Sequence, residues 1–326
     1  MIISVLDHII LTVVNIHCRL VYRKLIKRCT KQLRKLDIYH RKMHLAMPET
    51  GNEKFLWRKI FDHDPRFIMA SDKLRCKQWI ATQNYNMKIS DIIWQAEHDD
   101  ITTLKELSLT QDIVLKANHG SGTNEFIKKG TFDAATATRK MQQWLAFDHG
   151  DRHGEWGYFG IDRRIFAEQW IEPQAGTLSD IKLYLFSGKI LRIAHILGGP
   201  AQDICNTWNL DQDGRPVQSK EAATIAKSDY RIPLPDTITD AIDIGYRIGA
   251  EFDHVRVDFL TDGNDLWFGE LTLYNQGGYL LFPSASDPQS EVSRTWDIRT
   301  TWFLNTEQPG WRGCYARALR RSLDRH

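Results

Sequence analysis

Cysteine is scarce in this 326-residue sequence, and the five cysteines that occur are scattered, odd in number and never arranged as Cys-x-x-Cys. A disulfide framework requires paired cysteines, and a cysteine-type zinc site requires closely spaced ones, so the sequence favours neither. We therefore expect a chain that works in the reducing cytoplasm.

Long uninterrupted hydrophobic runs are also missing. The apolar opening segment, residues 1–20, is broken by Asp7, Asn15 and Arg19. It falls short of the roughly 18 to 20 apolar residues that a membrane-spanning helix needs. Its basic residues follow the apolar part instead of preceding it, and no small-residue cleavage site appears. A signal peptide is therefore not expected.

The opening segment has helical periodicity instead. Its apolar residues recur at spacings of three and four, which predicts one helical face made of Ile2, Leu6, Ile9, Val13, Ile16 and Leu20. The favoured interpretation is a helix that packs on the body of the protein. The alternative is an amphipathic helix on the inner leaflet of an anionic membrane, aided by the basic residues that follow it.

Acidic residues are nearly absent from both ends of the chain. Residues 19–42 carry ten lysines and arginines against Asp37 alone, and residues 312–326 carry five arginines against Asp324. Residues 43–311 hold the remaining 28 basic and 38 acidic side chains, so the body of the protein is acidic. Basic ends favour contact with an anionic surface, and an acidic body argues against a large nucleic-acid interface. We expect no nucleic-acid partner.

The sequence does contain ample material for a folded core, since 42% of its residues are hydrophobic, with 11 Trp and 14 Phe. At roughly 150 residues per domain, its length indicates two lobes that share a cleft. Hairpins mixed with helices, without a run of βαβ units, indicate an α+β fold. Periodicity and capping predict strands at residues 113–116, 165–170, 181–186 and 190–195, and helices at 133–147, at 238–253 and after the N-cap Asp72.

Two carboxylates stand out in a further predicted hairpin. Asp258 and Glu270 lie on successive strands, residues 254–260 and 266–272, joined by a short turn. If these strands pair antiparallel, both carboxylates can project from the same face. Two oxygen ligands with open positions suit Mg²⁺ bound to a polyphosphate. Structural salt bridges explain the same residues equally well, because Arg256 lies two residues from Asp258.

A lysine before a glycine-rich turn forms a second candidate site. Lys116 ends a strand rich in apolar residues and is soon followed by Gly120 and Gly122. An ammonium beside exposed backbone N–H groups can cradle a phosphate. The segment does not match the GxxxxGK[ST] loop, and a histidine in such a turn, here His119, is more often structural than catalytic.

Several segments, taken in order, resemble the TupA-like (teichuronopeptide biosynthesis) branch of the ATP-grasp family. They are ETGNEKFLWRKIFDHDPRF, DKLRCKQWI, VLKANHGSG, RRIFAEQWI, DIKLYLFSGK, VRVDFL and FGELTLYNQGGY. The resemblance implies an ATP-grasp fold, in which two α+β lobes enclose a nucleotide cleft. That domain would span residues 46–326, with a lid lobe at about 110–172 and a metal-binding lobe at about 173–305. Residues 1–45 would form a basic, amphipathic helical extension.

The resemblance also implies three sets of site residues. The ATP-binding set, with lysines for the phosphates and an edge strand for adenine, is Lys73, Lys116, His119, Gly120, Ser121, Gly122, Glu168, Gln169, Trp170 and Ile171. The catalytic set that holds the transferred phosphate is Lys182 and Arg256. The Mg²⁺ ligands are Asp258, Glu270 and Thr272. Thr272 stands where the wider superfamily commonly has Asn, so Asn275 is an alternative ligand.

The activity that the resemblance implies is ATP- and Mg²⁺-dependent ligation of a carboxylate to an amine through an acyl phosphate. Such a site works by positioning and charge stabilisation, and it needs no Ser or Cys nucleophile. The substrate would be an amino acid or a glycan of a surface polysaccharide. We expect the protein in the cytoplasm, with the inner face of the membrane as a further location.

Two alternatives remain open at this point. Asp211-x-Asp213 is compatible with the DxD sequence of a nucleotide-sugar glycosyltransferase, although the neighbouring Gly214 and Pro216 favour a hairpin turn. A non-catalytic protein that keeps the nucleotide-binding fold would bind ATP without turnover.

Overall fold

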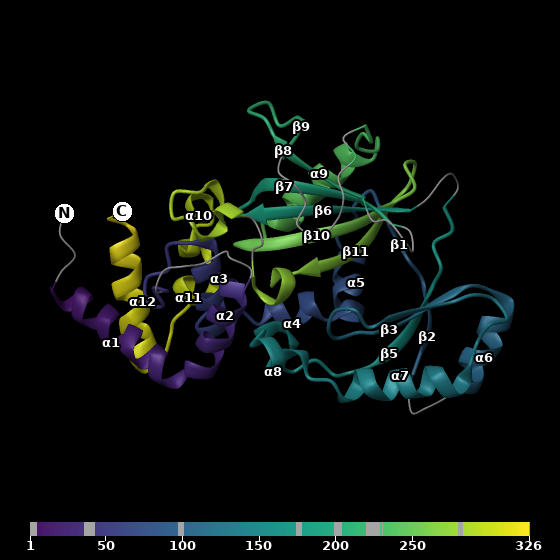
Figure 1. The fold of residues 1–326 in the computed structure, drawn as a ribbon, viewed down its shortest axis with the longest axis horizontal. Helices are drawn as coiled ribbons and strands as arrows, with labels where there is room; N and C mark the ends of the chain where they lie inside the picture. Colours follow the sequence, from purple (N-terminus) through teal and green to yellow (C-terminus); the bar gives the residue numbers. More distant parts are fainter. Residues whose placement is uncertain are drawn as a thin grey trace.

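The chain is arranged in three parts along its longest axis (Figure 1). A block of helices at one end holds both the N-terminal and the C-terminal helix, a large sheet occupies the middle, and a small sheet with its own helices lies at the other end. The computed structural model describes residues 5–35, 43–96, 101–173, 178–198, 204–219, 229, 231–279 and 283–325.

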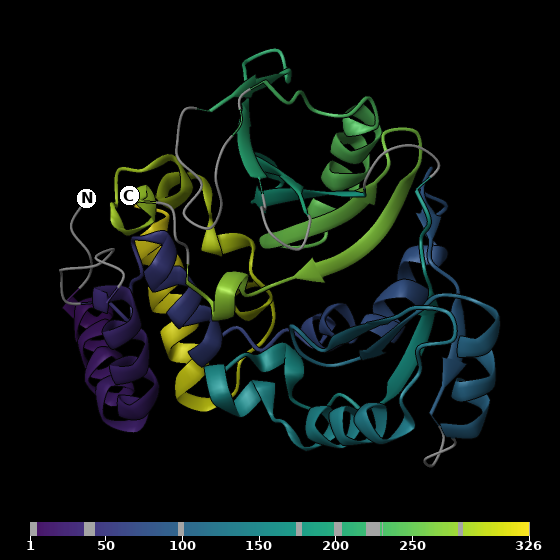
Figure 2. The ribbon, with the colours of Figure 1, turned by 45° about the vertical axis from the view of Figure 1, so that its right-hand side comes forward.

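The helical block joins the two ends of the sequence in one hydrophobic core (Figures 1 and 2). Leu11, Trp57 and Tyr315 are buried in it. At its edge the Arg321 guanidinium donates to the buried Asp7 carboxylate, which ties the first helix to the last. The elements of this block are α1 (Val5–Val21), α2 (Arg23–Lys35), α3 (Gly51–Ile60), α11 (Trp302–Asn305) and α12 (Gly310–Leu323).

Helix α1 packs on the body, as predicted, but not through the predicted face. Its buried side chains are Asp7, Leu11, Val14 and Cys18. The predicted apolar face is between 51% and 73% exposed at Leu6, Ile9, Val13, Ile16 and Leu20, and Ile2 lies outside the described residues. At 3.6 residues per turn the two sets lie on nearly opposite sides of the helix. The prediction failed because the ion pair of Asp7 with α12 is a long-range contact that periodicity does not reveal.

No single helix in the described ranges is both long and apolar enough to cross a membrane. Helices α1 and α2 meet the length and composition criteria only when they are taken together, and the chain is bent by 86° where they join.

The large sheet is antiparallel except at one edge, where β1 runs parallel to β11. Helix α9 (Ile238–Gly249) packs against β6, β7 and β10, and α4 (Arg66–Ser71) and α5 (Lys73–Ala81) pack against β11. Figure 2 shows α9 on one side of the sheet and α4 and α5 on the other. The strand order is β1 (Lys88–Ile89), β11 (Leu266–Thr272), β10 (His254–Thr261), β6 (Ser179–Phe186), β7 (Lys189–Leu197), β8 (Ile204–Leu210) and β9 (Pro216–Gln218).

The small sheet is antiparallel throughout and has its own core. Its order is β2 (Ile92–Gln95), β5 (Ile165–Gln169), β3 (Ile113–Ala117) and β4 (Asn124–Ile127), and α6 (Ile101–Thr110) and α7 (Ala134–Ala146) accompany it. The predicted lid segment, about 110–172, omits β2 and α6. In the structure, both belong with the small sheet. Strand β2 pairs with β5 across about 70 residues of sequence, and α6 contributes Leu104 to the core of this sheet.

The strands and helices predicted from periodicity are present, and Asp72 caps α5 by accepting from the N–H groups of Leu74 and Arg75. The Asp211-x-Asp213 segment is an exposed hairpin turn between β8 and β9, in which Asp211 accepts from the backbone of Asp213 and Arg215. Shorter helices complete the chain: α8 (His149–His153), η1 (Trp156–Tyr158), η2 (Asn275–Gly277), η3 (Pro283–Ser286), α10 (Glu291–Thr295) and η4 (Ile298–Thr300).

Candidate functional site

Two cavities meet at the end of strand β11. The large cavity, of about 730 Å³, lies between the two sheets and is lined by residues of both. The side cavity, of about 410 Å³, extends from β11 toward α8 and η1. Lys73, Phe268, Gly269 and Glu270 line both cavities, so this group of residues is their junction. Both volumes fall in the range of small-molecule sites.

The predicted carboxylate pair occupies the junction. Asp258 and Glu270 are cross-strand partners on β10 and β11, as the period-two pattern predicted. Asp258 is 3% exposed. The Arg256 guanidinium donates to both its oxygens, at 2.6 and 2.7 Å, and the Lys182 ammonium, from the paired strand β6, donates at 2.8 Å. The salt-bridge interpretation therefore describes Asp258 in this structure.

The charges of this cluster support one another. Burial raises the pKa of Asp258, but Arg256 and Lys182 more than offset it, so the pKa of that carboxyl lies below its usual range. Burial lowers the pKa of Lys182, and Asp258 and Asp180 reverse this to a net rise. All three groups are therefore ionised at neutral pH. Two further carboxylates lie beside the cations, with Asp180 3.5 Å from Lys182 and Glu270 3.4 Å from Arg256.

Glu270 is the more accessible of the two carboxylates. Its side chain is 36% exposed, 3.4 Å from Arg256 and 3.9 Å from Lys73. The Thr272 hydroxyl donates to it at 3.2 Å, so this predicted metal ligand acts here as a support for Glu270. Asn275, the alternative ligand, is buried with its amide against the His254 ring and lines neither cavity. Among the described residues no group of three or more His, Cys, Asp or Glu side chains forms a ready metal site.

Glu168 is held by two lysines at the wall of the large cavity. Its carboxylate, 3% exposed, lies 2.5 Å from the Lys116 ammonium and 2.9 Å from that of Lys77. Burial raises the pKa of Glu168, but the two lysines bring it below its usual value. Sequence analysis missed Lys77, although its i, i+4 spacing from the predicted Lys73 places both on one face of α5. Gln169, Trp170 and Ile171 line the same cavity, as expected of an edge strand.

The glycine-rich turn is fixed to α5 more tightly than predicted. The Lys73 ammonium donates to the Gly120 carbonyl, and the Asn118 amide donates to the Asp72 carboxylate. His119 is buried, its ring bonded to Asn118 and to the Trp144 carbonyl, and it lines neither cavity. The prediction that His119 contacts the nucleotide therefore finds no support in the geometry. Of the turn residues only Ser121 lines a cavity, and it is the side cavity.

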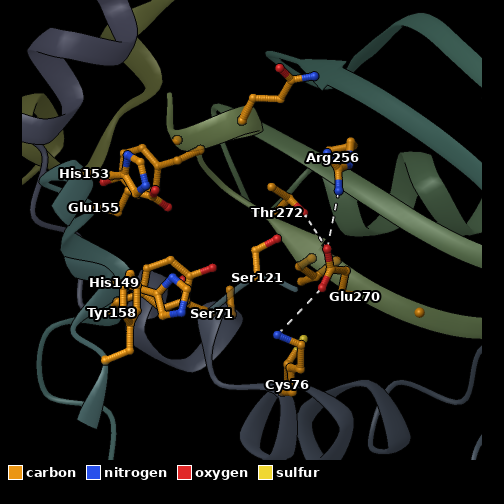
Figure 3. Close-up of a pocket in the computed structure, with 18 of the residues that line it drawn as sticks. Ser71, Cys76, Ser121, His149, His153, Glu155, Tyr158, Arg256, Glu270 and Thr272 are labelled. Atoms are coloured by element: carbon orange, nitrogen blue, oxygen red, sulfur yellow. Dashed lines mark hydrogen bonds and ion pairs between the residues drawn. The ribbon is translucent and has the colours of Figure 1, made fainter. Parts of the chain in front are cut away.

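The residues on the far wall of the side cavity were not predicted from the sequence. Figure 3 shows His149, His153, Glu155 and Tyr158 opposite Arg256 and Glu270. These four residues come from α8 and η1, in the segment DHGDRHGEWGY. The segment has no regular period and matched no motif. Its concentration of histidines and acids was the one signal available.

Comparison with known proteins gives a family match. The profile of the family described as TupA-like ATPgrasp matches residues 53–289. No curated protein sequence matches the chain. Among solved structures the chain is similar to D-alanine–D-alanine ligase from Bacillus anthracis, at 17% identity and a TM-score of 0.39, over 70% of this chain and 67% of that one.

Two further structures are similar at the same distant level. ATP-grasp ligase PsnB, complexed with minimal precursor, has 11% identity and a TM-score of 0.35, over 83% of this chain and 68% of that one. N5-carboxyaminoimidazole synthase from Aspergillus clavatus has 10% identity and a TM-score of 0.36, over 79% of this chain and 53% of that one. TM-scores this low carry no argument about substrates, so the assignment rests on the family match.

The two glycines of the turn allow a matched test of the packing between the turn and the side cavity. Both have positive φ, +88° at Gly120 and +71° at Gly122, so alanine at either is expected to cost about 1–2 kcal/mol. A Cβ on Gly120 would lie 2.0 Å from the His149 ring, whereas one on Gly122 meets nothing within 4 Å. Urea denaturation should therefore show that Gly120→Ala lowers the free energy of unfolding by about 1–3 kcal/mol more than Gly122→Ala does.

Removal of the His149 ring is the control for that difference. In a His149→Ala background the extra loss at Gly120 should disappear, because the clash partner is gone. Equal losses in the two single variants would contradict the close approach of His149 to the turn.

Proposed function

The chain belongs to the TupA-like ATP-grasp family of ATP-dependent carbon–nitrogen ligases, and from this membership we propose that it joins a carboxylate to an amine through an acyl phosphate. The observation that supports this most strongly is the convergence of cations at the junction of the two cavities. Lys73, Lys116, Lys182 and Arg256 all line one or both cavities there. Lysine and arginine side chains in such an arrangement can form charge-assisted hydrogen bonds with a polyphosphate.

Mg²⁺ fits the same residues. Asp258 and Glu270 offer hard oxygen donors from paired positions, and Mg²⁺ is commonly bound by one or two carboxylates together with substrate phosphates. When bound there, the ion would neutralise phosphate charge and polarise the phosphoryl group. Thr272 would orient Glu270 through the hydroxyl contact already present. Asp258 would exchange some of its contacts with Arg256 and Lys182 for the metal, which frees both cations for phosphate.

The residues of this chain account for two chemical steps. In the first, a substrate carboxylate oxygen attacks the γ-phosphorus, the bond to the β-phosphate oxygen breaks, and ADP leaves. Lys182 and Arg256 stabilise the negative charge on the transferred phosphoryl group. In the second, an amine nitrogen attacks the acyl carbon, the carbon–oxygen bond to phosphate breaks, and inorganic phosphate leaves with the electron pair. The site works by orientation and charge, with Lys116 and Lys77 on the wall of the ATP cavity.

For the substrate we propose an amino acid or an amino group that is joined to a surface polysaccharide or its precursor, as the resemblance to the teichuronopeptide-biosynthesis branch implies. The place of reaction in this proposal is the cytoplasm, where ATP is supplied. The glycosyltransferase alternative gains no support from the structure, because Asp211 and Asp213 lie in an exposed turn and line neither cavity.

Thermal unfolding with Mg²⁺ and ATP, compared with Mg²⁺ and a UDP-sugar, tests the nucleotide site. A ligand at about 100 times its Kd adds roughly 2.7 kcal/mol of stability. We expect this stabilisation with ATP, and we expect Lys116→Ala to abolish it. The control variant Lys128→Ala, which changes an exposed lysine on the loop after β4, should still be stabilised by ATP. ADP release on addition of amino acids or uronic acids would then identify the carboxylate. Stabilisation by the UDP-sugar alone would contradict the proposal.

We also propose that α1 and α2 bring the enzyme to an anionic membrane. The apolar stripe of α1, residues Leu6, Ile9, Val13, Ile16 and Leu20, points away from the body. All seven lysines and arginines of α2 are exposed, and each basic side chain near an anionic bilayer contributes about 1 kcal/mol. Trp311, 45% exposed, packs against His17 beside the stripe, and tryptophan favours the membrane interface.

Co-sedimentation with vesicles tests this contact. The protein should bind vesicles of phosphatidylcholine with phosphatidylglycerol, but not of phosphatidylcholine alone, and salt should weaken binding. The triple variant I9S/V13S/I16S should no longer bind the anionic vesicles. A control variant with serine at Leu109 and Val217, which are exposed apolar residues elsewhere in the chain, should still bind them. Unchanged binding of the triple variant, or a dimer that the triple variant dissociates, would contradict the proposal.

A further inference from the structure

A buried carboxylate lines the side cavity with no side-chain partner among the residues that the structure describes. Glu155 is the residue before η1 and lines the cavity, yet it is only 7% exposed. Its carboxylate has no hydrogen bond or ion pair to any side chain that the structure describes. The Lys59 ammonium, which donates to the Gly277 carbonyl, acts on Glu155 through its charge, without an ion pair or hydrogen bond. A buried carboxylate in this state is costly unless a ligand supplies a cation.

The backbone around Glu155 keeps the space before it open. Gly277 has a φ of +74°, and a Cβ there would lie 3.5 Å from the Glu155 Oε1 and 3.1 Å from the His153 Nδ1. Gln276, next to it, adopts a φ of +49°, which is unusual for a residue with a side chain. Strained backbone of this kind is often retained at binding sites. Segment 276–277 thus lies directly beside the carboxylate and the His153 ring, where a side chain at 277 would crowd them.

The side cavity carries two cations beside Glu270 at its junction end and a separate carboxylate, Glu155, on its far wall. Arg256 and Lys73 lie at the junction end, where the transferred phosphoryl group would be held. Glu155 lies on the far wall, beside His153, as Figure 3 shows. With both substrates bound, the phosphorylated electrophile would therefore lie at the junction end and the cationic group of the second substrate at Glu155.

We propose that the side cavity binds the amine substrate as a primary ammonium group, and that Glu155 holds this group and accepts its proton as the nitrogen attacks. The inference rests on the proposed ligase function and adds the chemical class of the second substrate and its recognition residue. A metal cation fits less well, since no group of three or more potential metal ligands occurs among the described residues.

The proton balance of the step is complete with this assignment. An ammonium nitrogen has no free electron pair, so one proton must leave before the nitrogen attacks the acyl carbon. Glu155 takes that proton, the new carbon–nitrogen bond forms, and the carbon–oxygen bond to phosphate breaks. The second proton of the nitrogen leaves with the phosphate, which is released as the dianion or monoanion.

The ionisation of Glu155 is suited to such a transfer. Burial raises its pKa, Lys59 opposes the rise, and the resulting pKa is about 7. A base with a pKa near the working pH is efficient in proton transfer. The groups that face this carboxylate are Lys59 of α3, His153 of α8, Tyr158 of η1, and Tyr274 and Tyr279 on either side of η2. Burial raises the pKa of each tyrosine, so all three stay neutral.

Thermal unfolding in the presence of Mg²⁺ and ADP tests the ammonium site without the need for turnover. The probes are ethanolamine, glycine and glucosamine, each beside its N-acetylated form, which has the same frame without the charge. We expect at least one amine, and not its acetylated form, to raise the melting temperature of the full chain. Glu155→Gln should abolish that rise, and Glu251→Gln, the same change at an exposed position outside both cavities, should keep it.

The pH dependence gives a second readout. Glu155 is ionised above its folded pKa, so stabilisation by the amine should be present at pH 8 and lost as the pH falls to 6. His153→Asn, which removes the imidazole beside Glu155, should keep this dependence. Glu155→Asp keeps the charge on a shorter side chain, so it should retain part of the increase in melting temperature that the amine causes. This variant serves as the test if Glu155→Gln does not fold.

The outcomes separate this inference from the proposed function. Stabilisation by no amine, equal stabilisation by the acetylated forms, or a full rise in Glu155→Gln would each contradict the ammonium site. Absence of any shift with Mg²⁺ and ADP alone would instead contradict the nucleotide site, and the amine shifts would still report on Glu155. A rise that is specific to an amine and dependent on Glu155 supports the inference.

Discussion

The buried contact of Asp258 with Arg256 and Lys182 is the interaction on which the rest of the site depends. Two cations share one carboxylate in a place that water hardly reaches, and Glu270 adds only a partly exposed second anion. Buried charges are stable only when they are paired and hydrogen-bonded. The cluster is therefore held together in the absence of ligand, and in the proposed function its two cations would turn to phosphate when a metal ion engages the carboxylates.

The two sheets and the terminal helices serve to hold this cluster at a junction. Strands β6, β10 and β11 place Lys182, Asp258 and Glu270 in register. Helix α5 brings Lys73 and Lys77 to the same wall, and its cap is bonded to the glycine-rich turn of the small sheet. In the proposed function, the large cavity on one side would bind ATP and the side cavity on the other would bind the second substrate. The transferred phosphoryl group would lie between them, where both cavities share residues.

Much of this site follows from local sequence patterns. Period two predicted that Asp258 and Glu270 face one another, and a capping residue predicted where α5 begins. What could not be predicted depends on contacts between distant segments. The packed face of α1 is decided by an ion pair between Asp7 and Arg321, 314 residues apart. Glu155 is functional in our proposal because α3, α8, η1 and the segment around η2 enclose it, and no spacing in the sequence reveals that enclosure.

The central claim is that Asp258 and Glu270 together bind a divalent cation on a nucleotide polyphosphate. The most direct measurement is a crystal structure with Mn²⁺ and ADP, in which anomalous scattering locates the manganese. The account predicts manganese between the two carboxylates, with Lys182 and Arg256 turned from Asp258 toward phosphate. Manganese bound elsewhere, with the contacts of Arg256 and Lys182 to Asp258 intact beside bound ADP, would contradict it.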